Sequence, residues 1–293
     1  MRFRKLLKVA ACLLACVSTS SVAAAESNLP QWKALHYRLS LLFVSAEADI
    51  QVRKPDRDEV MSALINPAGL RVIRPGPEVY ELLIKTDNLG RRSESRVWYT
   101  PDFKMLQMSR FDSGKRHRRK VFRYLQDGFW SFQRNPKNDE EADDESKWSE
   151  EATKVVHKPE ALKSVSVIED SLLFHMVATL PLRKKGDSYD YYSYINDAVF
   201  KNRLEVVGKR DVEVDYVEKY PGREKWVEGD TELVHIRVIS QAVDAKNQDD
   251  FEIMGLKGAL SLYVDAKTGV LVQLSGDVDY LGRVDITLYK VES

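Results

Sequence analysis

Apolar and polar residues alternate along most of the chain, which is the pattern of half-buried β-strands. In the N-terminal half, the alternating stretches are separated by the turn-forming sequences Asn-Pro-Ala-Gly, Asp-Ser-Gly and Gln-Asp-Gly. The pattern predicts strands at 37–43, 46–52, 80–85, 95–100, 105–111, 120–125 and 129–132. Strands at intervals of roughly ten to fifteen residues favour an antiparallel sheet that curls on itself.

The alternation resumes after residue 187. Strands are predicted at 189–195, 202–207, 211–218, 231–242, 258–265, 270–279 and 283–291. Segments 208–210, 266–269 and 280–282 are expected to be hairpin connections. The last three strands form a meander that would close or edge a barrel. The predicted fold class is therefore mainly β, a curved antiparallel sheet or half-open barrel.

One segment has helical periodicity instead. Its apolar residues recur at i, i+1, i+4, i+5 and i+8 and form one face of a helix: Leu172, Leu173, Met176, Val177 and Leu180. Asp170 is expected to cap this helix and Pro181 to end it, with His175 falling toward the other side. We expect a short amphipathic helix on the concave face of the sheet. Its apolar face either belongs to the core or lines a ligand cavity.

An acidic segment interrupts the pattern at about 135–163. Six of the seven residues at 139–145 are carboxylic acids, with almost no apolar residues nearby. Such a segment buries too little surface to offset the entropy of ordering, so a mobile loop is expected. The spacing of the acids departs from that of a calcium-binding loop, so no metal site is predicted there.

The first 25 residues have the features of an export signal. Basic residues precede the apolar stretch 9–17, and three alanines end the segment before Glu26. We expect cleavage near Ala25, a periplasmic mature protein of one domain at 26–293, and no transmembrane segment after cleavage. The sequence Leu-Leu-Ala-Cys ending at Cys16 offers an alternative, in which Cys16 is lipidated and anchors the protein to the envelope.

Loss of this leader changes the charge and cysteine content. The chain has 45 basic and 45 acidic residues, and removing the four basic residues of the leader leaves 41 against 45. A mildly acidic protein has no general attraction for nucleic acid, which is not an expected partner. The only cysteines, Cys12 and Cys16, lie in the leader. The mature protein therefore lacks disulfides and thiol chemistry, and its stability must come from a hydrophobic core.

Motifs of catalysis and cofactor binding are missing from the sequence. It contains no Gly-x-Ser-x-Gly, His-Glu-x-x-His or glycine-rich phosphate-binding sequence. The five histidines lie far apart without a spacing typical of metal ligands: His36, His117, His157, His175 and His235. We predict no catalytic residues, no cofactor and no metal site, and hence a protein that is not an enzyme.

A basic cluster lies in a predicted hairpin and consists of Lys115, Arg116, Arg118, Arg119 and Lys120. Such a cluster can bind an anionic partner, such as lipid phosphates or an acidic polysaccharide. It can equally be the solvent-facing arm of a hairpin whose charge protects a sheet edge. The sequence leaves both interpretations open.

Several segments resemble a family of bacterial periplasmic proteins of unknown function. The resemblance rests on 169–174, Leu-Pro-Leu at 180–182, Lys-Gly-Asp at 185–187, 204–209, 259–265, 270–272 and 281–284. The fold of that family is similar to the curved half-barrel of the lipoprotein-localisation factors LolA and LolB. The resemblance covers roughly residues 165–291. It implies a fold more directly than a function, because these motifs are structural.

A concave apolar sheet covered by a helix suits an acyl chain, because burial removes hydrocarbon from water at about 0.8 kcal/mol per methylene. The leading hypothesis is a non-enzymatic periplasmic binding or chaperone-like protein for a lipid, a lipoprotein or another envelope component. A structural or assembly partner of an envelope protein machine is the first alternative. A hydrolase of envelope polymers is the second.

Overall fold

The computed structural model describes residues 29–41, 44–88, 90–114, 117–158, 160–163, 165–195, 198–243 and 251–293. The expected export signal and Cys16 lie outside these residues. Within the described residues, no helix is both long enough and apolar enough to cross a membrane.

The protein is mainly β and is built on one large curved sheet, which confirms the predicted fold class. The N-terminal strands are β1 (Ala34–Leu41), β2 (Val44–Arg53), β3 (Tyr80–Asn88), β4 (Arg91–Tyr99), β5 (Met105–Ser113), β6 (Arg118–Tyr124), β7 (Gly128–Asn135) and β8 (Glu150–His157). The C-terminal strands are β9 (Val167–Ile168), β10 (Ser188–Ile195), β11 (Ala198–Tyr220), β12 (Arg223–Ala242), β13 (Lys257–Val264), β14 (Leu271–Val278) and β15 (Gly282–Glu292). Their order in the sheet is β8-β7-β6-β5-β4-β3-β2-β1-β15-β14-β13-β12-β11-β10-β9.

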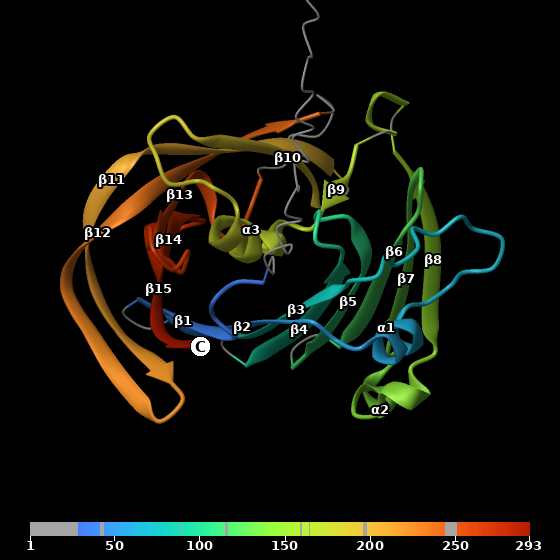
Figure 1. The fold of residues 1–293 in the computed structure, drawn as a ribbon. Helices are drawn as coiled ribbons and strands as arrows, with labels where there is room; N and C mark the ends of the chain where they lie inside the picture. Colours follow the sequence, from blue (N-terminus) through green and yellow to red (C-terminus); the bar gives the residue numbers. More distant parts are fainter. Residues whose placement is uncertain are drawn as a thin grey trace, which may run out of the picture.

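The two ends of the sheet differ in shape. Residues 217–219 of β11 pair in parallel with 290–292 of β15, so strands β11 to β15 form a ring, which we call the ring half. Strands β2 to β8 continue from β1 as an open curved wall, which we call the open half. Figure 1 shows the ring half on the left and the open half on the right, with helix α3 (Leu173–Thr179) between them.

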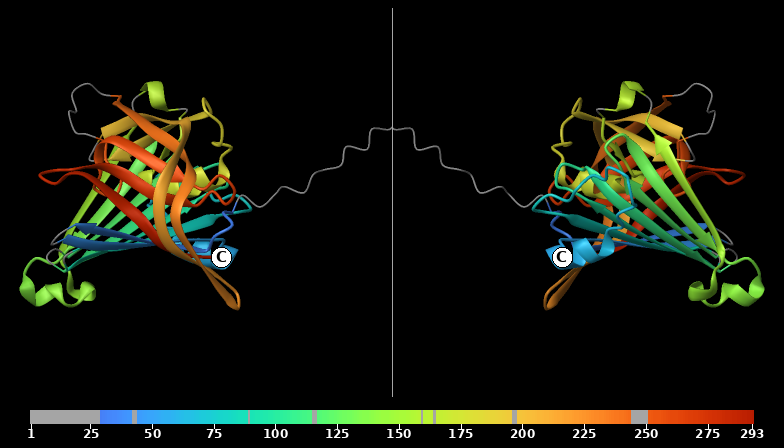
Figure 2. Two further views of the ribbon diagram at one scale, coloured as in Figure 1. Left: turned by 90° about the vertical axis from the view of Figure 1, so that its left-hand side faces the viewer. Right: turned by 90° about the vertical axis from the view of Figure 1, so that its right-hand side faces the viewer.

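One predicted connection is wrong. Segment 208–210 is not a hairpin turn, because β11 runs unbroken from Ala198 to Tyr220. A β-bulge lies between Val206 and Gly208, where Gly208 has a φ of +152°. The glycine that suggested a turn instead lets the strand change register and bend. The true turn lies at Pro221-Gly222, and the long β11–β12 hairpin projects beyond the rest of the sheet (Figure 2).

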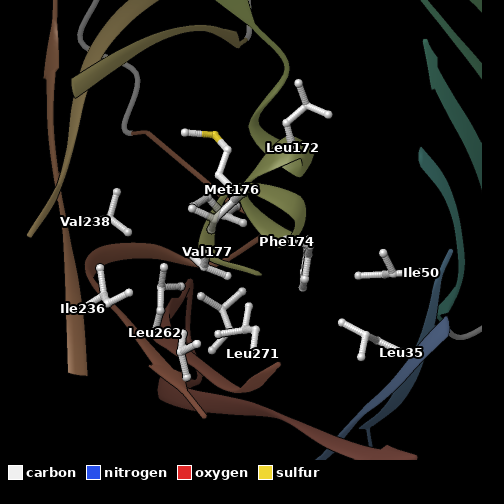
Figure 3. Packing of buried hydrophobic residues seen from close by; sticks show 14 of the residues in the cluster. Leu35, Ile50, Leu172, Phe174, Met176, Val177, Ile236, Val238, Leu262 and Leu271 are labelled. Atoms are coloured by element: carbon white, nitrogen blue, oxygen red, sulfur yellow. The ribbon is translucent and has the colours of Figure 1, made fainter. Parts of the chain in front are cut away.

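Helix α3 joins the two halves through a single core. The short 3-10 helix η3 (Asp170–Leu172) leads into α3, so a helical segment lies where it was predicted. Figure 3 shows Val177 directed toward Ile236, Leu262 and Leu271 of the ring half, and Phe174 directed toward Leu35 and Ile50. The helix therefore packs on both halves, and the expected polar side is absent.

His175 illustrates this burial. Its side chain is fully buried, and its Nδ1 lies 2.5 Å from the Tyr99 hydroxyl, with which it shares a hydrogen bond. The rings of Tyr80 and Phe103 pack against it at 5.5 and 5.4 Å between centroids. A buried polar group requires such a partner. His175, on the side of the helix that was expected to be polar, is therefore part of the core and packs against the open half.

The ends of the helical segment are held by charged side chains. Glu169, rather than the predicted Asp170, caps η3 by accepting the backbone N–H of Ser171 at 2.9 Å. At the other end, the Arg183 guanidinium donates to the carbonyls of Val177 and Ala178, both at 3.2 Å. These carbonyls lack partners within the helix, so Arg183 satisfies them after Pro181 ends it.

The acidic segment is more ordered than the expected loop. It contains the helix α2 (Asp139–Ala142), the 3-10 helices η1 (Glu145–Lys147) and η2 (Glu160–Leu162), and strand β8 at the edge of the sheet. Trp148 is buried and stacks on Phe111 at 5.8 Å between centroids. The segment is therefore not a plain loop, because one buried tryptophan and the backbone pairing of β8 with β7 anchor it. Its mobility stays a prediction.

The convex side of the open half is covered by helix α1 (Arg57–Ala63), which the periodicity did not predict. Beside it, the buried Arg123 guanidinium donates to the carbonyls of Ile65, Leu106 and Ile73. Burial lowers the pKa of Arg123 to about 10. These bonds hold the loop after α1 against the convex side of the sheet. Helix α1 does not cover the concave side.

Candidate functional site

The concave face of the open half changes character along its strands. Side chains near α3 are apolar and buried, as at Ile50, Leu82 and Val97. Farther along the same strands the inward positions are polar: Thr86 on β3, with Ser93 and Ser95 on β4. The face is therefore amphipathic, and α3 covers only its apolar part.

A groove of about 790 Å³ lies on the uncovered part of this face. Its apolar lining includes Tyr37, Ile84, Met108, Phe122, Phe129 and Ile286. Segments 169–171 and 252–255 complete the lining. A volume of this size is within the range of small-molecule sites, which is about 300–1,000 Å³.

Three basic side chains of β5 and β6 line the groove: Arg110, Arg118 and Lys120. We call these residues the cationic strip. Asp112 accepts from Arg110 Nε at 2.7 Å and from Arg118 Nη2 at 2.6 Å. Although burial opposes ionisation, hydrogen bonds and charge from Arg110 and Arg118 keep the pKa of Asp112 below its usual value. Asp112 therefore pairs with two of the three cations of the strip.

The predicted basic cluster is divided by the alternation of strand β6. Arg118 and Lys120 point into the groove, whereas Arg119 points to the other face and pairs with Glu145. Lys115 and Arg116 lie outside the described residues. The Lys120 ammonium lies 5.2 Å from the centre of the Phe122 ring, so the strip meets the apolar lining directly.

Carboxylic acids line the groove on the segments that face the sheet. Glu169, Asp170 and Glu252 belong to this group. Burial, together with the neighbouring Glu169 carboxylate, raises the pKa of Asp170 well above its usual value. The groove thus presents cations on β5 and β6, and acids both on the covering segments and on the strands β2 and β3, where Glu47 and Asp87 line it.

The apolar helix residues proposed from the sequence lie in the core. Leu172, Leu173, Met176 and Val177 are fully buried, and Leu180 is partly buried against the same cluster. The linings of the groove and of a second cavity, formed by other described residues, include none of the five. The ligand contact predicted for these residues stays a prediction.

Among the described residues, no group of three or more His, Cys, Asp or Glu side chains is placed to hold a metal ion. His36 pairs with Asp49 at 2.5 Å, and His235 lies 3.1 Å from the Ser261 hydroxyl on the ring half.

Most groove residues were not predicted from the sequence, and Arg110 and Asp170 are two examples. Arg110 lies opposite Lys120 in the β5–β6 pairing, so the predicted hairpin contained the signal once its register was known. Asp170 was assigned to a helix cap, and only its packing against Glu169 and Glu252 reveals it as a groove residue. No local sequence pattern identifies carboxyl groups that come together from distant segments, as Asp170 and Glu252 do.

No protein-family model, curated protein or solved structure matches this chain. The resemblance to periplasmic proteins with a LolA-like fold therefore stays a prediction.

Proposed function

We propose that this protein is a non-enzymatic, periplasmic binding protein for an acylated amphiphile of the cell envelope, either a lipid or the acylated end of a lipoprotein. One observation carries the proposal: a groove of about 790 Å³ on the concave sheet face joins apolar side chains to the cationic strip. The periplasmic location rests on the export signal expected from the sequence.

The groove offers complementary surfaces to the two parts of an amphiphile. Apolar side chains such as Met108 and Ile84 would remove an acyl chain from water, at about 0.8 kcal/mol per methylene. Arg110 and Arg118 would bind an anionic head group through charge-assisted hydrogen bonds. Geometry adds to this recognition, because a planar guanidinium can donate to two oxygens of one phosphate.

The acids of the groove refine the ligand class. A purely anionic head would meet Glu169 and Glu252 as well as the cationic strip. A zwitterionic head can place its phosphate on the strip and its ammonium near the acids. We therefore expect lysophosphatidylethanolamine to bind more tightly than lysophosphatidylglycerol of the same chain length.

The test compares two neighbouring arginines on opposite faces of β6. Titration with lysophosphatidylethanolamine carrying a pyrene-labelled chain should give saturable binding to the purified protein. Arg118→Gln should weaken this binding roughly tenfold, because one charge-assisted hydrogen bond is worth about 1.5–3 kcal/mol. Arg119→Gln is the matched control and should leave the affinity unchanged. Absence of binding, or equal losses from the two substitutions, would contradict the proposal.

A second candidate is a structural partner in an envelope assembly. Strand β8 is an open sheet edge, and its residues 150–155 are all exposed. Such an edge can pair with a strand of another protein. Thr153→Pro would remove one edge N–H, so loss of a co-purified partner with retained lysolipid binding would favour this function.

A further inference from the structure

A second cavity lies beyond the aromatic residues Tyr124, Phe129 and Tyr194, which line both this cavity and the groove. Phe129 and Tyr194 are in close contact, with 4.3 Å between ring centroids. The second cavity has a volume of about 640 Å³. Its lining is mainly apolar and includes Ile73, Met105, Leu125, Val156, Val165 and Val199.

The charged residues that line this cavity are all basic: Lys104, Lys158, Lys163 and the ionisable His157. Three of the four have a carboxylate partner just outside the lining. Lys104 pairs with Asp102 at 2.7 Å, Lys163 with Glu160 at 2.5 Å, and His157 with Asp127 at 3.3 Å. Lys104 and Lys163 therefore each have an opposite charge at ion-pair distance.

Lys158 differs from these neighbours. Its half-buried ammonium donates to the backbone carbonyls of Val165 at 2.9 Å and Lys163 at 3.4 Å. Across the described part of the chain, no carboxylate lies within ion-pair distance of Lys158. An ammonium has three N–H donors, and the two carbonyls use only two. Burial lowers the pKa of Lys158, and the charge of the Asp127 carboxylate opposes this effect only in part.

An apolar cavity with one ammonium that forms no ion pair among the described residues is complementary to an apolar monoanion. A single carboxylate would neutralise Lys158 and accept its third N–H, whereas a dianionic phosphate would bring excess charge into an apolar site. We infer that this cavity is a second binding site, distinct from the groove, for a single-chain carboxylate such as a fatty acid, with Lys158 holding the carboxylate.

The test uses the full protein, freed of bound lipid, and the fluorescent fatty acid cis-parinaric acid. The acid should bind more tightly than its methyl ester, which lacks the charge. Lys158→Gln should weaken binding of the acid roughly tenfold or more and leave binding of the ester unchanged. Lys104→Gln and Lys163→Gln are matched controls, since both residues line the cavity but already have carboxylate partners. Neither control should change the affinity more than about twofold.

A cavity-filling variant tests the location independently of charge. Val199→Phe should weaken the acid and the ester alike, provided that circular dichroism shows an unchanged fold. Equal affinity of acid and ester in the unmutated protein, or equal effects of the three lysine substitutions, would overturn the inference. Lysolipid binding in the groove should be unaffected by Lys158→Gln. Failure of this site therefore leaves the groove's function standing, and failure of the groove leaves this site standing.

Discussion

The ring half and the open half use the same kind of strand but differ in what fills their concave faces. In the ring half, inward residues are buried apolar side chains along the strands, such as Leu204, Ile236 and Leu262. In the open half, fully buried apolar residues lie beneath α3, whereas Met108 and Phe122 are only partly buried and line the groove. Serines, a threonine and the cationic strip line the groove as well.

The difference follows from closure. The β11–β15 pairing wraps five strands around their own side chains, so apolar residues there find partners within the sheet. An open sheet must have its concave face covered by something else, and one seven-residue helix is too short to cover all of it. The ring half therefore supplies stability, and the open half keeps the concave surface that the proposed function assigns to a ligand.

The largest effect should come from the core at α3. Leu173→Ala or Met176→Ala should lower the free energy of unfolding by about 2–5 kcal/mol, because both side chains are fully buried and leave a cavity. Met108→Ala is the matched change in the groove, where space already exists. It should lower stability by less than about half as much. Urea unfolding measures all three.

These free energies of unfolding also test the hypothesis, drawn from the sequence, that the apolar face of the helix binds a ligand. Small losses for Leu173→Ala and Met176→Ala, together with weaker cis-parinaric acid binding, would move the site to α3. Large losses with unchanged binding would assign both residues to the core.

A glycine tests how tightly α3 is held by the ring half. Gly269 has a φ of +70°, and a Cβ there would lie 2.5 Å from the Ala178 carbonyl oxygen. Gly222 at the hairpin turn has a similar φ of +76° but no atom within 4 Å of such a Cβ. Both Ala substitutions introduce backbone strain, whereas only Gly269→Ala also displaces the helix. Gly269→Ala should be the more destabilising by about 1–3 kcal/mol in thermal or urea unfolding. Equal losses would show that α3 shifts freely.

The strands could be predicted well because alternation is a local signal. The hairpin of β5 and β6 and the closing meander lie at the positions predicted from the alternation of apolar and polar residues. The error at Gly208 arose because glycine marks both turns and bulges, and only the partner strand distinguishes them. The parallel β11–β15 pairing joins residues about seventy positions apart, which no local pattern reports.

The site was less accessible to sequence analysis. Arg118 and Lys120 were identified by charge, but strand alternation places Arg119 on the opposite face. No sequence motif identified Lys158, because its distinguishing feature is that it forms no ion pair among the described residues. Such features depend on how distant segments pack, and they emerge only in three dimensions.

A smaller effect on the free energy of unfolding is expected at Asp170, which lines the groove. Because burial and Glu169 raise the pKa of Asp170, the folded protein binds this proton more tightly than the unfolded chain does. The resulting stability is complete below the usual pKa of 3.8 and is lost as the pH rises through the raised value. Asp170→Asn should therefore increase the free energy of unfolding at pH 7, and the gain should shrink toward pH 4. A loss of stability at pH 7 would contradict this cause.

Asp187 should show the opposite sign. It accepts the backbone N–H groups of Lys184 and Arg183 at 2.8 and 2.9 Å, and these bonds lower its pKa. Its contribution is present at neutral pH and lost as the pH falls through the lowered value. Asp187→Asn should therefore reduce the free energy of unfolding at pH 7, and the deficit should vanish in acid.

The smallest effect is expected at the projecting β11–β12 hairpin. Trp226 on β12 is 64% exposed, whereas the next residue, Val227, packs partly against the core. Alternation places the two side chains on opposite faces of one strand. Trp226→Ser should change the free energy of unfolding by no more than about 0.5 kcal/mol. Val227→Ser should cost more, because it removes buried apolar surface. Urea unfolding that gave equal losses would show that the hairpin packs on both faces. Weaker lysolipid binding with unchanged stability would extend the ligand contact from the groove to the hairpin.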